Sequence, residues 1–277
     1  ENGEVFMPPS LYAEGKLSRK HNIVTDDFKY VNSLSPQGQP KVTMASPPVM
    51  HFFLGHESYD PDIYSSDEEY FADLTQAYKD EVVELAEAGC SYIQLDDTAL
   101  PCNCDEDARE SIRARGEDPD QLTDTYVKAI NDAVSSRPDN MFAGMHMCRG
   151  NLKGLWMAAG GYEPIAEKIF NQLNIDAFFM EYDNERSGDF QPLRFLPKGK
   201  VAVLGLISTK TPELEDKDAL KRRIDEAAKI VPLEQLALSP QCGFSSGGGS
   251  GQVVTEDDTK RKLELVVEVA TEVWGSV

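Results

Sequence analysis

The stretch Met141-Phe-Ala-Gly-Met-His-Met-Cys148 decides the fold that this sequence predicts. Its first five residues form a short apolar run that is typical of a buried β-strand, and the run leads into His146 and Cys148. Two residues apart on a strand, these side chains lie on the same face, where both can ligate one metal ion. The pair alone is weak evidence, because a histidine at a strand end is more often a hydrogen-bonded structural residue.

Similar apolar runs alternate with helical patterns along the chain. The runs that predict strands are 41–45, 91–95, 141–145, 177–180, 200–206 and 236–238. The segments with helical periodicity are 67–88, 120–135, 162–173, 215–230 and 255–274. Six predicted strands, five of which are followed by a predicted helix, indicate parallel strands with right-handed crossovers. We expect a single catalytic domain over 1–277, with an irregular, proline-rich lead-in at 1–40 and the strand–helix repeats at 41–277.

Two architectures accommodate parallel strands joined by helices: an open doubly wound sheet and a closed barrel. No G-x-G-x-x-G follows any predicted strand, which disfavours a nucleotide-binding sheet. A (β/α)₈ TIM barrel needs eight units, and the chain supplies six. The 40 residues before Lys41 are too few and too polar to hold two more. The sequence therefore predicts a (β/α)₈ barrel whose first units lie outside this chain.

Two further candidate ligands, Glu181 and Cys242, each follow a later apolar run. Parallel strands of one barrel end at the same mouth, so we expect these residues to converge there with His146 and Cys148. One imidazole, two thiolates and one carboxylate make a tetrahedral ligand set for zinc. The alternative for Glu181 is a structural ion pair with Arg186.

Zinc held by two thiolates activates water poorly, but it keeps an incoming thiol deprotonated and nucleophilic. The ligand set therefore favours alkyl transfer to sulfur over hydrolysis. Asp96 and Asp97 end the run at 91–95, and only one of them can face the mouth because neighbouring strand residues point to opposite faces. The inward Asp suits the amino group of a substrate, whereas a helix cap is the alternative. Cys102 and Cys104 could form a second metal or redox pair, but C-x-C is too short for a thioredoxin-like motif and has no visible partners, so they are interpreted as loop cysteines.

Composition excludes several classes of partner and location. The net charge of −21 argues against nucleic acids and anionic membranes. No apolar run approaches the length of a membrane span, and the first residues lack the pattern of a signal peptide. Five sparse cysteines favour a reducing compartment, so we expect a cytoplasmic protein. The glycine-rich segment Gly247-Gly-Gly-Ser-Gly251 has the composition of a flexible linker.

Four motifs resemble those of the cobalamin-independent methionine synthase family, over roughly residues 41–274. His146-Met-Cys148, the Glu that follows the next strand, and Pro240-Gln-Cys-Gly243 resemble the family's zinc motifs. Ile93-Gln-Leu-Asp96 resembles its strand I-Q-I-D. The wider phrases are similar to those of the short, single-domain relatives of the synthase.

The resemblance implies a barrel of the uroporphyrinogen-decarboxylase and methionine-synthase type, with His146, Cys148, Glu181 and Cys242 as zinc ligands. It also implies that Asp96 contacts the amino group of homocysteine. Asp97 is a second candidate for substrate binding, although Asp97-Thr98 stands where the family has Glu-Pro. That difference leaves the amino-acid pocket open.

We therefore expect a zinc-dependent methyltransferase of methionine biosynthesis that methylates a thiol, with homocysteine as the leading acceptor. Its small-molecule partners are that thiol and a methyl donor, either methyl-folate or methylcobalamin, and a homo-oligomer is compatible with the sequence. One alternative is a zinc-dependent alkyltransferase for another thiol or electrophile, of the epoxide:coenzyme M type. The other is a non-catalytic or decarboxylase-like barrel with structural cysteines.

Overall fold

The computed structural model describes residues 10–245 and 253–275. Six parallel strands form one sheet in chain order, from β1 to β6. The strands are β1 Val42–Ala45, β2 Tyr92–Asp97, β3 Phe142–Met147, β4 Ala177–Glu181, β5 Val201–Ile207 and β6 Leu236–Pro240. The six predicted strands are confirmed, and β2 to β6 each end one or two residues beyond their apolar runs.

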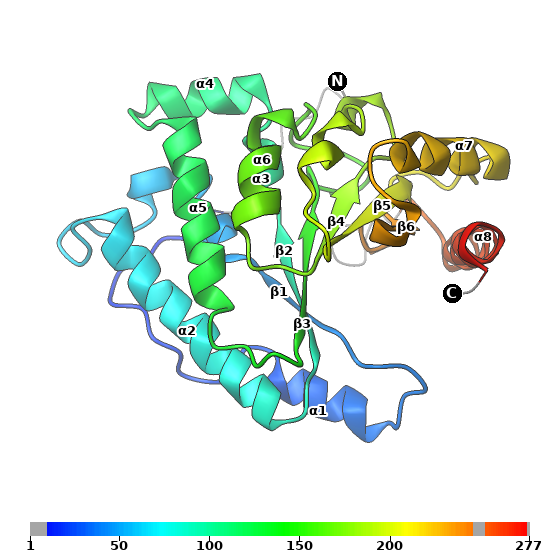
Figure 1. Cartoon of the computed structure of the whole chain (residues 1–277). Helices are drawn as coiled ribbons and strands as arrows, with labels where there is room; N and C mark the ends of the chain where they lie inside the picture. The colour runs from blue at the N-terminus through cyan, green and yellow to red at the C-terminus, as the bar shows by residue number, and fades with distance from the viewer. Residues whose placement is uncertain (1–9, 246–252, 276–277) are drawn as a thin grey trace.

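Helices follow five of the six strands, as the periodicity predicts, whereas only two short 3₁₀ turns lie between β4 and β5. They are α1 Thr25–Ser33, α2 Asp67–Glu87, α3 Ala99–Cys102, α4 Glu106–Ala114, α5 Pro119–Ala133, α6 Glu163–Gln172, α7 Lys217–Ala228 and α8 Glu256–Trp274. Short 3₁₀ turns are η1 Pro47–Met50, η2 Gly55–Glu57, η3 Glu185–Ser187, η4 Gln191–Phe195 and η5 Leu233–Gln235. In Figure 1, α2, α5 and α6 cover one side of the sheet, and α7 and α8 lie beyond β5 and β6. Within the described residues, no helix is both long and apolar enough to span a bilayer.

Local sequence sets where the long helices begin and end. Ser66 caps α2 by accepting a hydrogen bond from a first-turn N–H, and Asp118 caps α5 just before a proline at the first helical position. Thr255 and Asp258 form a reciprocal capping box at the start of α8. Gly275 ends that helix with a left-handed backbone (φ 79°). These caps satisfy N–H groups that a helix leaves without partners.

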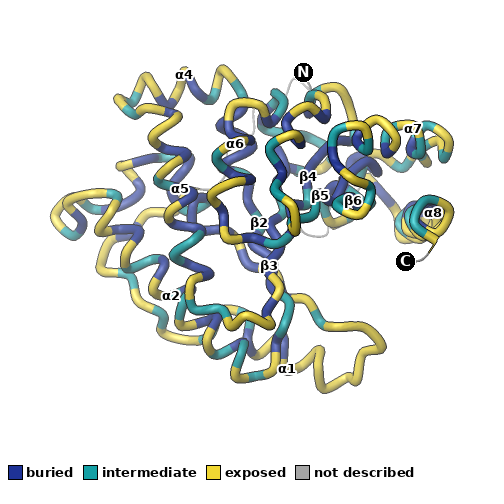
Figure 2. Tube along the Cα trace, in the orientation of Figure 1, coloured by how far each residue is buried: buried dark blue, intermediate teal, exposed yellow. Residues whose placement is uncertain are grey.

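The two faces of the sheet differ in burial. The face toward the helices is buried on β1 to β5, and Phe178 of β4 packs edge-to-face on Phe170 of α6 with ring centroids 5.0 Å apart. The opposite, inner face is more open, since Phe142 of β3 is 37% exposed and Thr43 of β1 is also exposed. Figure 2 shows the buried residues gathered between the strands and the helices. The main core of this chain is therefore the layer between sheet and helices.

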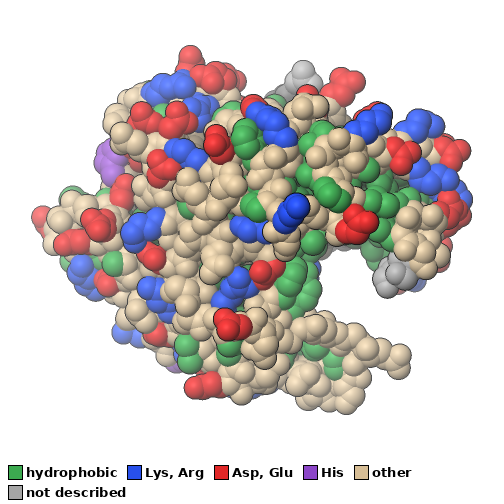
Figure 3. Space-filling view, in the orientation of Figure 1, with side chains coloured by type: hydrophobic (Ala, Val, Ile, Leu, Met, Phe, Trp, Pro, Cys, Tyr) green, Lys and Arg blue, Asp and Glu red, His purple; other side chains and the backbone are tan. Residues whose placement is uncertain are grey.

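The sheet is an arc in this chain. Among the described strands, β1 pairs only with β2, and β6 pairs only with β5, so both keep a free edge. Figure 3 shows the molecule hollowed on the side between α1 and α8, with hydrophobic side chains along the wall. The carboxyl ends of all six strands still meet on one side, as parallel strands require.

Two details correct the sequence-based expectations. The lead-in at 1–40, expected to be irregular, contains α1, whose Phe28 is buried. The helix has a weak apolar pattern and no side-chain cap, so little in its local sequence predicts a helix here. Two short helices that were not predicted, α3 and α4, follow β2, and Asp105 is the N-cap of α4. The predicted linker Gly247–Gly251 lies outside the described residues.

Candidate metal centre

Three of the predicted ligands converge at the carboxyl ends of β3 and β6. His146 lies near the end of β3, Cys148 follows that strand directly, and Cys242 comes just after β6. Their ligand atoms all lie within 4.8 Å of one another. Ligand atoms around tetrahedral zinc are roughly 3.3–3.8 Å apart, given metal–ligand bonds of about 2.0–2.3 Å. A small contraction would place all three on one ion, so the spacing fits zinc.

The charges of the three groups also fit a soft divalent metal. The Cys242 thiol donates a hydrogen bond to the Cys148 sulfur, which lowers the pKa of Cys148 and raises the pKa of Cys242. Burial lowers the pKa of His146, but the neighbouring Cys148 thiolate outweighs burial and raises it overall. The hydrogen bond thus favours loss of the proton from Cys148 before Cys242. A thiophilic cation that binds both sulfurs would take the place of the proton that lies between them.

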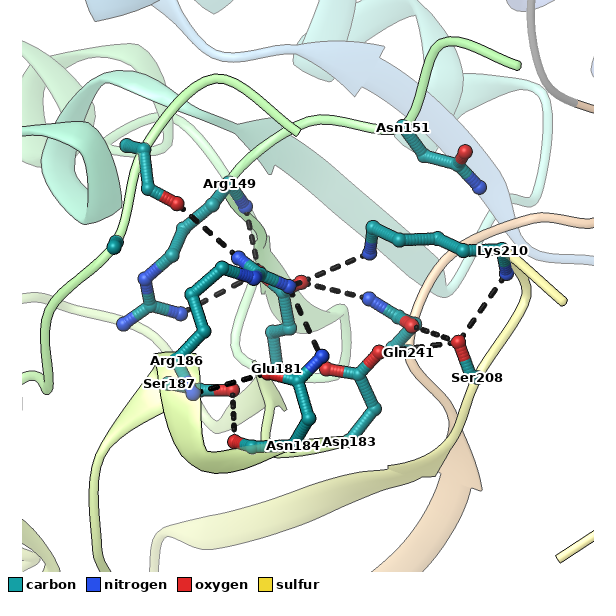
Figure 4. Close-up of polar contacts among 12 residues, drawn as sticks. Arg149, Asn151, Glu181, Asp183, Asn184, Arg186, Ser187, Ser208, Lys210 and Gln241 are labelled. Atoms are coloured by element: carbon teal, nitrogen blue, oxygen red, sulfur yellow. Dashed lines mark hydrogen bonds and ion pairs between the residues drawn. The ribbon is translucent and has the colours of Figure 1, made fainter. Parts of the chain in front are cut away.

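The fourth predicted ligand, Glu181, makes a different set of contacts. It ends β4, and its fully buried carboxylate is surrounded by donors (Figure 4). Oε1 accepts hydrogen bonds from Lys210 Nζ (2.9 Å), Gln241 Nε2 (2.8 Å) and Arg186 Nη2. Oε2 accepts from the Arg149 backbone N–H (2.8 Å) and from Arg149 Nη1 (3.4 Å). The alternative ion pair with Arg186 is thus confirmed, while metal ligation by Glu181 stays a prediction.

The cations around Glu181 keep it ionised. Burial alone raises the pKa of Glu181, but the Lys210 ammonium and the Arg186 guanidinium outweigh burial and bring it to about 2. Sequence reasoning missed Lys210 and Arg149 as members of this cluster. Their positions in the sequence could have predicted this. Arg149 follows β3 and Lys210 follows β5, so both lie at the same edge of the sheet as the candidate ligands.

Asp96 faces the same side of the sheet as His146, which is its register partner on β3. Its Oδ1 accepts a hydrogen bond from Gln94 Nε2 (2.6 Å), and Lys41 Nζ donates to Gln94 Oε1 (2.9 Å). Burial raises the pKa of Asp96. Its side chain is only partly buried, so this carboxylate can still accept hydrogen bonds from a bound cation.

Asp97 lies on the opposite face of β2 and is fully buried. Its carboxylate accepts hydrogen bonds from the Ser46 hydroxyl and from the Leu100 N–H, the latter at 2.7 Å. Burial raises the pKa of Asp97 to about 6. These contacts tie β2 to the loops after β1 and β2, and contact between Asp97 and substrate stays a prediction. Cys102 and Cys104 are also buried, outside the group of converging ligand atoms.

A second group of nearby metal-type ligands was not anticipated. The ligand atoms of His51, Asp67 and Glu117 lie within 4.8 Å of one another. The His51 ring already contacts the Tyr126 hydroxyl and the Asp67 carboxylate, each at 3.0 Å. Glu117 pairs with Arg115. The protein itself thus provides partners for His51, for Asp67 and for one oxygen of Glu117, whereas Glu117 Oε1 is buried without a hydrogen-bond partner.

Comparison with known proteins agrees with the fold. The family model described as the catalytic domain of cobalamin-independent synthase matches residues 44–272. The uncharacterized protein YxjH of Bacillus subtilis is 44% identical over 266 residues, which is 96% of this chain and 70% of that protein.

Two solved structures are also similar. One, from Listeria monocytogenes and provisionally named a vitamin-B12-independent methionine synthase, has a TM-score of 0.75 and 37% identity. The match covers 95% of this chain and 73% of the Listeria chain. A B12-independent methionine synthase from Shewanella sp. W3-18-1, in complex with selenomethionine, has a TM-score of 0.68 at 18% identity and shares the fold. The match covers 93% of this chain and 68% of the Shewanella chain. The chain therefore belongs to the family of cobalamin-independent methionine synthase catalytic domains.

Proposed function

We propose that this chain is a zinc-dependent methyltransferase domain that methylates the sulfur of homocysteine. The observation that carries the proposal is the convergence of His146, Cys148 and Cys242 beside the partly exposed Asp96. An imidazole with two thiolates suits zinc, and a carboxylate next to it suits an acceptor that has both a thiol and an amino group.

Each residue has a separate task in this proposal. His146, Cys148 and Cys242 hold the metal, and when bound, zinc supplies the Lewis acidity that keeps the acceptor thiol deprotonated at neutral pH. Asp96 accepts hydrogen bonds from the substrate ammonium group. The Gln94 amide orients the Asp96 carboxylate, and Lys41 in turn orients that amide. Fixing thiol and amino group together aligns the sulfur for attack on the methyl carbon.

Family membership supports methyl-folate over methylcobalamin as the methyl donor, because the family model and the similar structures are named cobalamin-independent or B12-independent. We propose methyl-folate first and methylcobalamin second. All five cysteines are free thiols, which supports a reducing compartment, the cytoplasm.

Metal analysis tests the site. We expect one zinc per chain, and the Cys148→Ser variant should lose most of it because a neutral hydroxyl replaces a thiolate. Cys90→Ser is the matched control, since Cys90 is also buried but lies before β2, away from the group. Equal zinc in wild type and Cys148→Ser would refute the assignment.

An activity screen tests the substrates. The zinc-loaded protein is incubated with homocysteine, cysteine or coenzyme M, each with methyl-folate or methylcobalamin, and products are identified by mass spectrometry. We expect methionine from homocysteine. Alkylation of another thiol alone would favour the alkyltransferase alternative. Absence of zinc would favour the decarboxylase-like or binding barrel.

A further inference from the structure

The carboxylate of Glu181 is saturated with hydrogen bonds. Its two oxygens accept five of them, from Lys210, Gln241, Arg186 and twice from Arg149. An ionised carboxylate offers about four lone-pair sites, so no free site is left for a metal ion. Glu181 can ligate a metal only by giving up some of these bonds.

The donors that hold Glu181 are themselves buried charges. The side chains of Arg149, Lys210 and Arg186 are 0%, 4% and 8% exposed. Buried cations require a counter-charge, and removing it is costly. Besides Glu181, Asp183 supplies an anion near this cluster, 3.6 Å from Arg186, and burial raises the pKa of Asp183. Glu181 is therefore the main counter-ion of three cations.

Arg186 is fixed in its place independently of Glu181. Its guanidinium lies over the Trp156 ring, 4.8 Å from the ring centroid, and Nη1 donates to the Ala158 carbonyl at 3.2 Å. Lys210 has Glu181 as its ammonium partner (2.9 Å). Arg149, Arg186 and Lys210 thus form a basic seat for the Glu181 carboxylate (Figure 4). Arg149 directly follows the candidate ligand Cys148, so this seat lies next to the candidate metal centre.

We propose that Lys210 and Arg186 are positioning residues that compete with the metal for the carboxylate of Glu181. The proposal rests on the proposed function, namely on a zinc ion held by His146, Cys148 and Cys242. Competition makes Glu181 a weak fourth ligand. When the acceptor thiol binds, the carboxylate moves onto the basic seat that already fits it. Lys210 and Arg186 thereby favour the thiol over the carboxylate at the metal.

The Lys210→Met variant tests this competition. Loss of one charged donor frees Glu181 for the metal, so zinc should bind about tenfold more tightly and homocysteine about tenfold more weakly. Zinc affinity is measured by competition with a chelating dye, and homocysteine affinity by calorimetry. Lys210→Arg should behave like wild type. Lys200→Met is the matched control, because Lys200 flanks the other end of β5 and bonds only backbone carbonyls.

A double-mutant cycle separates this competition from simple repulsion between Lys210 and the metal. If Lys210 acts through the carboxylate, Lys210→Met should change zinc affinity in wild type but not in the Glu181→Gln background. An equal gain in both backgrounds would mean direct repulsion and would overturn the proposal. No change in either background would overturn it as well.

X-ray absorption at the zinc edge supplies a readout that does not depend on Glu181→Gln folding. On addition of homocysteine, the wild-type zinc should gain a sulfur and lose an oxygen ligand, and Lys210→Met should retain that oxygen. Identical spectra of the two proteins would overturn the proposal. Absence of zinc from the wild type would instead refute the proposed function, so the two failures are distinguishable.

Discussion

Gly205 of β5 lies in close contact with the backbone of β4 and with Gln241, which precedes the candidate ligand Cys242. A Cβ at this position would lie 2.6 Å from the Met180 carbonyl oxygen and 2.9 Å from the Cα of Gln241. Both contacts are with backbone, so they cannot be relieved by a side-chain rotation. The absence of a side chain at Gly205 thus allows the chain before Cys242 to approach β4 and β5 closely.

We predict that Gly205→Ala lowers the free energy of unfolding by about 1–3 kcal/mol and weakens zinc binding. Urea denaturation and metal analysis measure the two effects. Gly243→Ala is the control: Gly243 neighbours Cys242, has no positive φ, and a Cβ there meets nothing within 4 Å. Equal stability of the two variants would contradict the steric argument.

Asp96 permits a second test at the scale of one residue. Asp96→Asn keeps an oxygen for the Gln94 amide but loses the charge that attracts an ammonium group. Steady-state kinetics should show KM for homocysteine raised about tenfold to a hundredfold, given the usual strength of charged hydrogen bonds. Zinc content should stay at the wild-type value, and its loss would instead indicate a structural role.

At the scale of elements, one carboxylate attaches the amino-terminal segment to α2. Glu81 is fully buried and accepts hydrogen bonds from the backbone N–H groups of Ile23, Val24 and Thr25 at 2.7–2.9 Å. It also pairs with Arg19. The N–H groups before and at the start of α1 thus find their partner on another helix, which explains why α1 needs no side-chain cap of its own.

We predict that Glu81→Gln lowers the free energy of unfolding by about 2–4 kcal/mol at pH 7, because a buried network loses its charge. Burial raises the pKa of Glu81, but the N–H groups of Val24 and Ile23 outweigh burial and lower it below its ordinary 4.5. A lowered folded-state pKa stabilises the fold above pH 4.5, and this contribution is lost as the pH falls further. The difference from wild type in urea denaturation should therefore shrink below pH 4.5.

Glu84→Gln is the matched control for this prediction. Glu84 lies one turn along α2 and also pairs with Arg19, but its side chain is 31% exposed. Its loss should cost less than about 1 kcal/mol, as for other exposed ion pairs. If Glu84→Gln lowered the free energy of unfolding as much as Glu81→Gln, any negative charge near Arg19 would suffice to attach the amino-terminal segment to α2. The buried hydrogen-bond network of Glu81 would then not be the cause.

At the scale of the whole molecule, stability comes from the layer between sheet and helices. Phe178→Ala, on the buried face, should cost about 3–5 kcal/mol. Phe142→Ala, on the open inner face, should cost about 1 kcal/mol or less, because Phe142 keeps one edge-to-face neighbour, Tyr92. Urea denaturation of both variants measures the contrast. Similar costs would mean that the inner face is as closely packed as the outer one.

Much of this architecture could be predicted, because strand and helix patterns repeat with short-range periods. The apolar run before His146 is β3, and the runs before Glu181 and Cys242 are β4 and β6. The rule that parallel strands end on one side then brings His146, Cys148 and Cys242 together, since it depends only on strand direction. The boundaries of helices such as α2 followed from local capping residues.

The sequence by itself determined the order of strands and helices, and which residues arrive at the carboxyl edge of the sheet. Only the tertiary structure decided what Glu181 contacts there, because its partners come from separate loops after β3, β4, β5 and β6. It also decided that α1 forms, since its partner Glu81 lies about 56 residues further along the chain. Periodicity reports which face of an element is apolar. Buried polar contacts depend on distances between segments that are remote in sequence, and no local pattern encodes them.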